Sequence, residues 1–362
     1  MNNSIRQISQ VFVGSAIALT TFSIQPVIGA SSYNQIFIFG DSLSDPGNLF
    51  NLIGPDNIPS GFDGGRFSNG PVWSEYFAWD LGLNPELWIQ RDKNGELQFI
   101  PNIPSDGINF AIAGAKTDEN HITLNPLLFG LKQQVDAFIN LIDLLEKKTL
   151  NNPQALGVLI AGANDYGGGQ SNPEIPVGNL LTKIELLSKA GLKNILVGNQ
   201  PDLGKTPFAR SLDEEVRTGL TTLTIAHNNL LETALKNFSE SNDTNLILFD
   251  FYSLFNNVFV NPSEFGFINL TDNCTNIDVN AGVLNPDPLF REPCSEELQN
   301  QFLFFDNAHP NTVAHRFIAD EALRTVSTPE PSAISALGFL GMGLLALKGR
   351  PKKKEEKMVV AK

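Results

Sequence analysis

A residue suited to nucleophilic chemistry follows the first long apolar run of the chain. Ser42 lies in the segment 40–45 (GDSLSD), directly after residues 35–39 (QIFIF). A serine in a tight turn at the end of a buried strand can expose its hydroxyl as a nucleophile. Serines are also common in ordinary loops, so Ser42 alone is open to both interpretations.

A second candidate element lies near the other end of the chain, where Asp306 precedes His309 by three positions. The carboxylate can accept the imidazole N–H and fix the tautomer, which leaves the other ring nitrogen to take a proton from a serine. We predict that a helix begins at Pro310, because the fixed φ of proline suits a first helical turn. The plainer interpretation is that Asp306 only caps this helix.

Asn164 and Gly114 are candidates for stabilising negative charge on a reacting carbonyl oxygen. Asn164 follows a predicted strand at residues 156–160, and an amide donor in such a position is worth about 3 kcal/mol of barrier. Gly114 is one of the small residues at the end of the strand-like run 107–115 and can present its backbone N–H with no side chain in the way. Both residue types also form turns, which is the competing interpretation.

Alternating strands and helices must position these residues. Apolar runs predict strands at residues 35–39, 156–160, 194–197 and 245–249. Helical periodicity predicts helices from residue 131, over 180–189, and from a capping box at 211–214. A hairpin at 87–100, with a type I′ turn at Asn94-Gly95, interrupts the pattern. The alternation predicts a three-layer α/β fold with a mainly parallel sheet and reactive loops at the carboxyl ends of its strands.

These segments together resemble the GDSL-type, or SGNH, hydrolases, which share a flavodoxin-like sandwich. The matching segments occur in the family's order, at residues 39–48, 65–73, 109–115, 162–165 and 306–310. A counterpart of residues 196–207 favours the extracellular phospholipase, lecithinase and hemolysin branch. The resemblance implies an esterase or lipase with a Ser42, His309 and Asp306 triad, an acyl-enzyme and no cofactor. It also implies that Gly114 and Asn164 join the Ser42 N–H in the oxyanion hole.

Two departures and two alternatives accompany this resemblance. Ala113 stands where the family commonly has glycine, and Lys116 where a small or hydroxyl residue is usual, so the acyl or alcohol pocket is expected to differ. Acyl transfer to an alcohol uses the same residues as hydrolysis. A cell-surface adhesion protein on a retained hydrolase scaffold is the other alternative, because fold does not determine function.

The other histidines and the aromatic cluster are interpreted as structural. His121, His227 and His315 are expected to be structural or solvated, although His121 shares with His309 an aspartate three residues earlier. His121 falls in a polar loop and lacks a following proline. The aromatic residues of the segment 73–79 are expected to pack in the core.

Cys274 and Cys294 are a candidate disulfide. In an oxidising compartment they would close a loop of 21 residues, worth about 3 kcal/mol in the loop-entropy model. Two free buried thiols are the alternative. No histidine is near either cysteine in sequence, so no zinc site is predicted.

The two ends of the chain differ from its middle. Residues 1–30 have the basic start, apolar run and small final residue of a signal peptide, with a buried first helix as the alternative. Residues 328–362 contain Pro-Glu-Pro, an apolar run and a basic cluster, and resemble the PEP-CTERM sorting tail, with a plain anchor as the alternative. We therefore predict a hydrolase domain at 31–327, exported to the envelope or outside, with a transient inner-membrane anchor that a sorting protease removes.

Composition excludes some partners. The chain has 362 residues, of which 42% are hydrophobic, and its net charge is −14. Residues 31–331 carry −20, because the two ends contribute +1 and +5. This charge repels nucleic acid and anionic lipid, so neutral or zwitterionic ester substrates are favoured.

Overall fold

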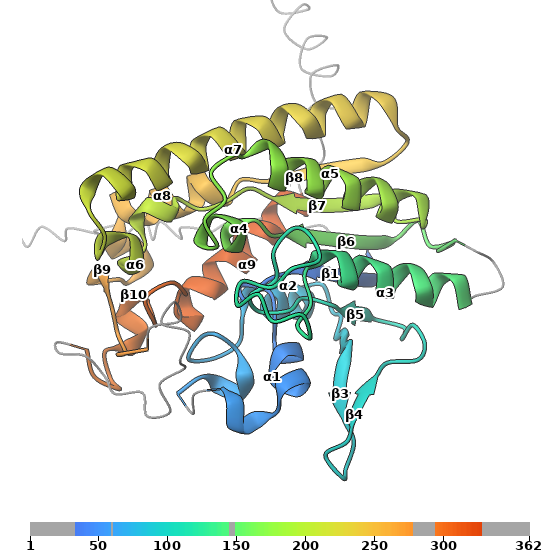
Figure 1. Cartoon of the computed structure of the whole chain (residues 1–362), viewed down its shortest axis with the longest axis horizontal. Helices are drawn as coiled ribbons and strands as arrows, with labels where there is room; N and C mark the ends of the chain where they lie inside the picture. Colours follow the sequence, from blue (N-terminus) through green and yellow to red (C-terminus); the bar gives the residue numbers. More distant parts are fainter. Residues whose placement is uncertain (1–32, 59–60, 145–148, 278–293, 328–362) are drawn as a thin grey trace, which may run out of the picture.

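The computed structural model describes residues 33–58, 61–144, 149–277 and 294–327 (Figure 1). The predicted signal peptide at 1–30 and sorting tail at 328–362 lie outside these described residues. Within the four described ranges, no helix combines the length and the apolar character that crossing a membrane requires.

Within the described residues, six parallel strands form the central sheet, in the order β2-β5-β1-β6-β7-β8. These strands are β1 (Gln35–Gly40), β2 (Glu86–Leu87), β5 (Gly107–Asn109), β6 (Ala155–Ile160), β7 (Asn194–Gly198) and β8 (Asn245–Phe249). Two separate pairs are the antiparallel β3 (Ile89–Arg91) and β4 (Leu97–Phe99), and the parallel β9 (Asn269–Asn273) and β10 (Phe302–Phe304). The predicted α/β class with a parallel sheet is confirmed.

Helices connect and cover the strands. The α-helices are α1 (Asn48–Ile53), α2 (Trp73–Asp80), α3 (Leu131–Leu144), α4 (Ala163–Gly167), α5 (Glu174–Lys189), α6 (Pro207–Arg210), α7 (Glu214–Ser241), α8 (Phe251–Val260) and α9 (Thr312–Ser327). Short 3₁₀ turns occur at Pro55–Asn57, Asp63–Gly65, Leu203–Lys205, Pro262–Phe265 and Gln299–Gln301.

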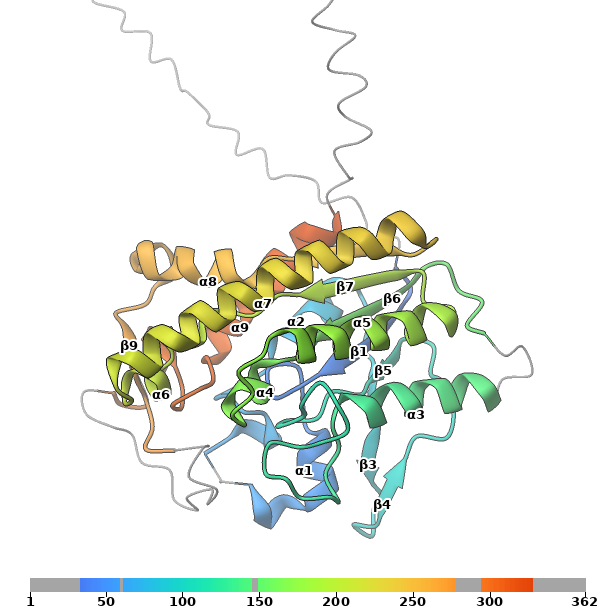
Figure 2. The same cartoon turned by 45° about the horizontal axis from the view of Figure 1, so that its top comes forward.

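The residues of β1 explain why the sheet has a helical layer on each face. Every residue of this strand is buried. Phe37 and Phe39 pack in the core with side chains of α3, α5 and α7, whereas Ile36 and Ile38 pack with α2, α8 and α9. Successive strand side chains point to opposite faces, so a continuous apolar run is buried only between two layers. Figure 2 shows α3, α5 and α7 across the near face.

The predicted capping box at the start of α7 is wrong. The helix begins at Glu214 after Asp213, and Ser211 lies outside it. The Ser211 hydroxyl instead donates to the Phe208 carbonyl at 2.7 Å, which closes the short helix α6. The nearer helix therefore uses the hydroxyl that the sequence pattern assigned to the later one.

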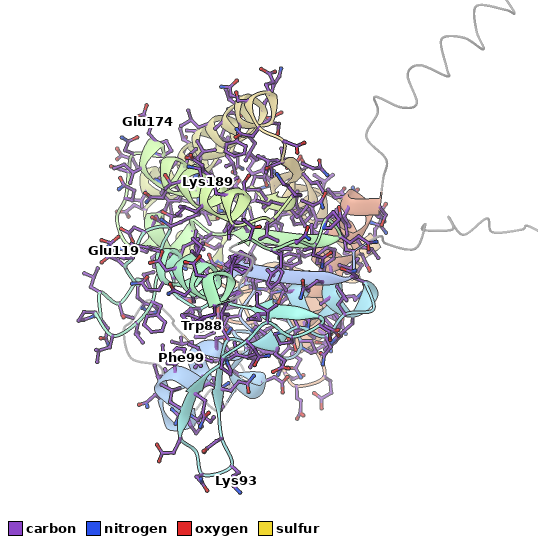
Figure 3. All side chains as sticks on the ribbon, turned by 90° about the vertical axis from the view of Figure 1, so that its right-hand side faces the viewer. Trp88, Lys93, Phe99, Glu119, Glu174 and Lys189 are labelled. Carbon is purple, nitrogen blue, oxygen red and sulfur yellow. A yellow bond between two sulfur atoms is a disulfide. The ribbon has the colours of Figure 1, made fainter. Side chains whose placement is uncertain are left out.

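The predicted hairpin is confirmed as β3 and β4, but its turn is not type I′. Gly95 has φ +83°, whereas Asn94 is not in the left-handed region that type I′ requires at both central positions. Asp92 Oδ1 accepts the N–H groups of Asn94 at 2.8 Å and Glu96 at 2.9 Å, which stabilises a wider turn. Figure 3 shows this turn, marked by Lys93, projecting away from the body.

Helix α9 begins two residues later than predicted. Pro310 pairs with Phe304 in an isolated β-bridge rather than occupying the first helical turn. Asn311 caps the helix, because its Oδ1 accepts the Ala314 N–H at 2.8 Å. The bridge at Pro310 leaves the segment 305–309 as a loop at the end of β10.

Candidate active site

Ser42 lies in a tight turn immediately after β1. The turn is closed by the Ser44 N–H, which donates to the Asp41 carbonyl at 3.0 Å. The Asp41 carboxylate accepts the Leu43 N–H at 3.1 Å. Ser42 is 8% exposed, so the turn leaves its hydroxyl at the edge of the sheet with limited access to water.

Gly40 and Gln134 hold the end of β1 in place. A Cβ at Gly40 would lie 2.4 Å from the Ile160 carbonyl oxygen of β6, so only glycine fits here. The buried Gln134 amide of α3 accepts the Gly40 N–H at 2.9 Å and donates to the Gly40 carbonyl at 2.8 Å. One side chain therefore satisfies the strand's last backbone groups before the turn.

His309 connects Asp306 to Ser42. Asp306 Oδ2 lies 2.7 Å from His309 Nδ1, and His309 Nε2 lies 2.8 Å from Ser42 Oγ. Asp306 is fully buried, and its Oδ1 accepts the N–H groups of Ala308 at 2.8 Å and His309 at 2.6 Å. The carboxylate thus places the proton on Nδ1 and leaves Nε2 to accept the Ser42 hydroxyl. Asp306 orients His309 and closes its own loop rather than capping α9.

Two further carboxyl groups support the Ser42 turn. Burial raises the pKa of Asp41 to about 6, although the Leu43 N–H and the nearby His309 lower it in part. Burial also raises the pKa of Asp45 to about 6, although hydrogen bonds from four backbone N–H groups lower it in part. These donors are Gly47, Asn48, Leu49 and Ala113. Asp45 therefore fastens the Ser42 turn to the loop that contains Gly114.

Gly114 and Asn164 lie on neighbouring loops. Gly114 follows β5 and has φ +82°, which favours glycine. Asn164 lies in the first turn of α4, and its Nδ2 donates to the Ala115 carbonyl at 3.1 Å. The adjacent Asp165 accepts the Thr117 N–H at 3.0 Å and the Thr117 hydroxyl at 2.7 Å. An amide nitrogen carries two hydrogens, so Asn164 retains one for a ligand.

The remaining histidines are buried. His227 accepts or donates at Nδ1 with the Tyr166 hydroxyl, 2.6 Å away, and burial lowers its pKa to about 4. His315 Nδ1 accepts the backbone N–H of Trp73 at 3.1 Å. Burial lowers the pKa of His315 to about 3, and His309 lowers it by a smaller amount. His121 is 4% exposed, so of the two expected environments, structural or solvated, it has the structural one.

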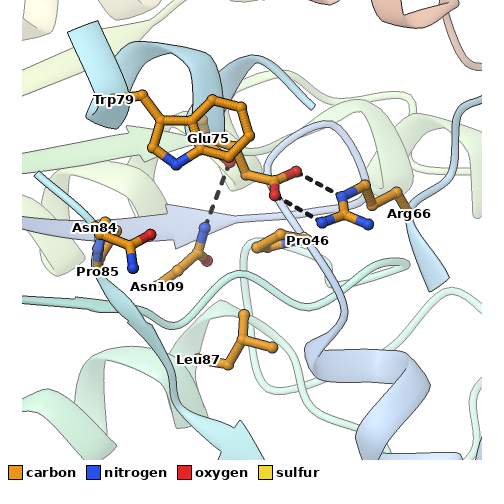
Figure 4. Close-up of a pocket in the computed structure, with 9 residues that line it drawn as sticks. Pro46, Arg66, Glu75, Trp79, Asn84, Pro85, Leu87 and Asn109 are labelled. Carbon is orange, nitrogen blue, oxygen red and sulfur yellow. Dashed lines mark hydrogen bonds and ion pairs between the residues drawn. The ribbon is translucent and has the colours of Figure 1, made fainter. Parts of the chain in front are cut away.

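A pocket of about 190 Å³ lies beside the Ser42 turn (Figure 4). Its lining residues are Pro46, Arg66, Ser74, Glu75, Trp79, Asn84, Pro85, Leu87 and Asn109. The side chains of Ser74 and Asn109 both donate to the Ser44 carbonyl at 2.9 Å. The pocket is therefore lined by residues that hold the Ser42 turn in place, and Ser42 itself does not line it. Trp79 is 46% exposed at the pocket, which corrects the expectation that it packs in the core.

Cys274 and Cys294 form a disulfide, as predicted. Both are buried and pack against Phe302 of β10, which leads into the Asp306 loop. In the described part of the chain, no cluster of three or more histidine, cysteine or acidic side chains has metal-binding geometry.

Three residues that the sequence patterns did not indicate hold the backbone around the site through side-chain hydrogen bonds. Gln134, Asp45 and Asn48 hold strand ends and loops rather than facing a substrate. Asn48 Nδ2 donates to the carbonyls of Asn109 at 2.9 Å and Ala111 at 3.0 Å. Asp45 and Asn48 lie close to Ser42 in sequence, but the partners that join them to the Gly114 loop, Ala113 for Asp45 and Ala111 for Asn48, lie more than sixty residues away. No local signal identifies such partners.

The α/β fold and the contacts among Ser42, His309 and Asp306 are suited to acyl transfer, and comparison with known families identifies an enzyme that acts on ester bonds. Residues 36–322 match the GDSL-like Lipase/Acylhydrolase family, and the chain belongs to that family. The resemblance inferred from the short segments is confirmed at this level.

Similar proteins include a hemolysin, an acyltransferase and a lipolytic protein. The chain is 29% identical to a thermolabile hemolysin of Vibrio parahaemolyticus serotype O3:K6, over 84% of this chain and 67% of that protein. It is 25% identical to a phosphatidylcholine-sterol acyltransferase of Aeromonas hydrophila, over 84% of this chain and 94% of that protein. A crystal structure of a lipolytic protein G-D-S-L family member from Veillonella parvula DSM 2008 aligns with a TM-score of 0.38 and 16% identity, covering 80% of this chain and 96% of that one.

Proposed function

We propose that this chain is an exported serine hydrolase that cleaves carboxylic esters with Ser42, His309 and Asp306. The observation that carries the proposal is the hydrogen-bond chain from Asp306 through His309 to Ser42, whose two ends lie far apart in sequence. Membership of an esterase and lipase family supports ester bonds as the target.

The geometry supports a two-step mechanism. Ser42 Oγ attacks the ester carbonyl while His309 Nε2 accepts the hydroxyl proton, and Asp306 stabilises the imidazolium that forms. The N–H groups of Ser42 and Gly114 and the Asn164 amide donate to the oxyanion. His309 returns the proton to the departing alcohol. Water then repeats the sequence on the acyl-enzyme and releases the acid.

We assign the substrate to neutral or zwitterionic lipid esters, in the manner of the phospholipase, lecithinase and hemolysin branch. The name of the phosphatidylcholine-sterol acyltransferase relative supports a lipid substrate. The charge of −20 on residues 31–331 opposes binding to anionic surfaces. Initial rates on p-nitrophenyl esters of increasing acyl length, phosphatidylcholine and acetylated polysaccharide test this. Activity confined to short acyl chains or to polysaccharide would contradict the lipid assignment.

Acyl transfer is the second candidate, favoured by the similarity to the acyltransferase of Aeromonas hydrophila. Hydrolysis and transfer share the acyl-enzyme and differ in whether water or an alcohol attacks it. Product analysis with phosphatidylcholine and added sterol distinguishes the two, because only transfer gives a steryl ester.

Export and tail removal complete the proposal. We infer that residues 1–30 direct export and that a sorting protease acts on the tail at 328–362, with transient inner-membrane anchoring before release. The Cys274–Cys294 disulfide supports an oxidising compartment. Cell fractionation with intact-mass measurement tests this, and a cytoplasmic full-length chain would contradict it.

Ser42→Ala tests the catalytic assignment. Hydrolysis of a short acyl ester should fall by about four orders of magnitude or more with the fold unchanged. Ser44→Ala is the matched control, since it removes the same atom two residues away in the same turn and should retain labelling by a fluorophosphonate. Unchanged turnover or labelling of Ser42→Ala would refute the assignment.

A further inference from the structure

His121 is hydrogen-bonded to the peptide group that joins Ala113 to Gly114. Its Nε2 lies 2.7 Å from the Ala113 carbonyl oxygen. A carbonyl only accepts, so the proton is on Nε2. His121 Nδ1 is then bare, and it accepts the Thr123 N–H at 3.2 Å and the Thr123 hydroxyl at 2.8 Å. Burial, the largest influence, lowers the pKa of His121 and favours this neutral form.

The direction of the Ala113 carbonyl also determines the direction of the Gly114 N–H. In a planar trans peptide the C=O and N–H bonds point in opposite directions. The flanking backbone groups are held as well, because Asp45 accepts the Ala113 N–H and the Gly114 carbonyl accepts the Ile122 N–H, both at 2.8 Å. Among the described residues, the Gly114 N–H itself has no hydrogen-bond acceptor. This donor is therefore oriented and left for a ligand.

The imidazole also explains why residue 114 is glycine. A Cβ at Gly114 would lie 2.2 Å from His121 Nε2 and 2.5 Å from His121 Cε1. Glycine has few restrictions on its backbone dihedrals, so the peptide before it rotates easily unless something holds it. His121 occupies the space that a side chain would need and supplies the hydrogen bond that prevents rotation.

We propose that His121 is a positioning residue that keeps the Gly114 N–H pointed at the oxyanion. This inference rests on the proposed function, because it assigns Gly114 to the oxyanion hole. His121 does not contact the substrate. It acts on the transition state through the Ala113–Gly114 peptide, and so affects kcat more than KM.

His121→Phe and His121→Gln separate the hydrogen bond from the packing. Phenylalanine retains a flat ring beside Gly114 without a donor, whereas the glutamine amide retains an N–H that can reach the Ala113 carbonyl. Loss of a whole oxyanion donor costs about 10²- to 10³-fold in kcat, so His121→Phe should lower kcat about 10- to 100-fold with KM within about twofold. His121→Gln should retain most of the wild-type kcat.

A trifluoromethyl ketone gives a readout that a purely structural role would not move. Ser42 adds to this inhibitor and forms a hemiketal oxyanion in the same hole. Its inhibition constant should rise in His121→Phe by about the factor by which kcat falls. Wild-type kcat in His121→Phe, a kcat loss without weaker ketone binding, or no restoration by His121→Gln would overturn the proposal.

A failure here is distinguishable from failure of the proposed function. Hydrolysis retained by Ser42→Ala would refute the serine mechanism, whereas an inactive Ser42→Ala with a fully active His121→Phe would refute only the role of His121. If His121→Phe does not fold, ¹⁵N NMR of the wild-type imidazole decides, with a protonated Nε2 and a bare Nδ1 expected. A protonated Nδ1 with a bare Nε2 would overturn the proposal.

Discussion

Asp306→Asn tests whether the carboxylate determines the tautomer of His309. Asp306 Oδ1 accepts two backbone N–H groups, and Oδ2 faces His309 Nδ1 at 2.7 Å. Asparagine must turn its carbonyl oxygen towards the two N–H donors, so its NH₂ faces Nδ1. His309 then accepts at Nδ1 and carries its proton on Nε2, where it can no longer take the Ser42 proton.

The expected loss follows from this reversal of the tautomer. In a Ser-His-Asp triad the same exchange lowers kcat about 10⁴-fold, equivalent to about 5 kcal/mol of transition-state stabilisation. The fold should persist, because the substitution is isosteric and the backbone hydrogen bonds of residues 308 and 309 remain. Measurement of kcat with a p-nitrophenyl ester at pH 7, together with thermal unfolding, separates activity from stability.

Asp202→Asn is the matched control. Asp202 is 3% exposed and accepts hydrogen bonds from the Gly204 N–H and the Thr221 hydroxyl, with no contact to His309. Its substitution makes the same chemical change in a similarly buried place and should leave kcat within about threefold. A decrease of less than tenfold in folded Asp306→Asn would refute the tautomer argument.

Three further variants test stability. Replacing Cys274 and Cys294 by serine should lower the free energy of unfolding by about 3 kcal/mol in urea titrations, and a loss under about 1 kcal/mol would contradict the loop-entropy account. Burial lowers the pKa of His227 to about 4. The contribution of the neutral imidazole to the free energy of unfolding is therefore fully present above about pH 6.5 and is lost as pH falls towards 4. His227→Gln should remove roughly 3 kcal/mol of that acid-side loss, and pH–stability curves parallel to wild type would refute this. Gly40→Ala should destabilise by about 2 kcal/mol or more in thermal unfolding, because its Cβ would lie 2.4 Å from the Ile160 oxygen; an unchanged Tm would contradict this contact.

Local patterns were sufficient for the sheet and insufficient for the turns. The apolar runs predict β1, β6, β7 and β8 to within a residue or two at each end, because strands buried on both faces need uninterrupted apolar sequence. The predictions of the turn type in the β3–β4 hairpin and of the first residue of α9 were wrong. Both depend on side-chain hydrogen bonds, of Asp92 and Asn311, that compete with the simplest motif.

The chain's sequence by itself determined the fold class, the family and the residue types available for ester chemistry. Periodicity, capping and short-range spacing act between near neighbours and can be read along one dimension. Only the tertiary structure brought His309 within 2.8 Å of Ser42 and buried His121 against Gly114. These contacts join separate loops at the carboxyl edge of the sheet. Their geometry depends on how the strands pair, and no short stretch of sequence contains that information.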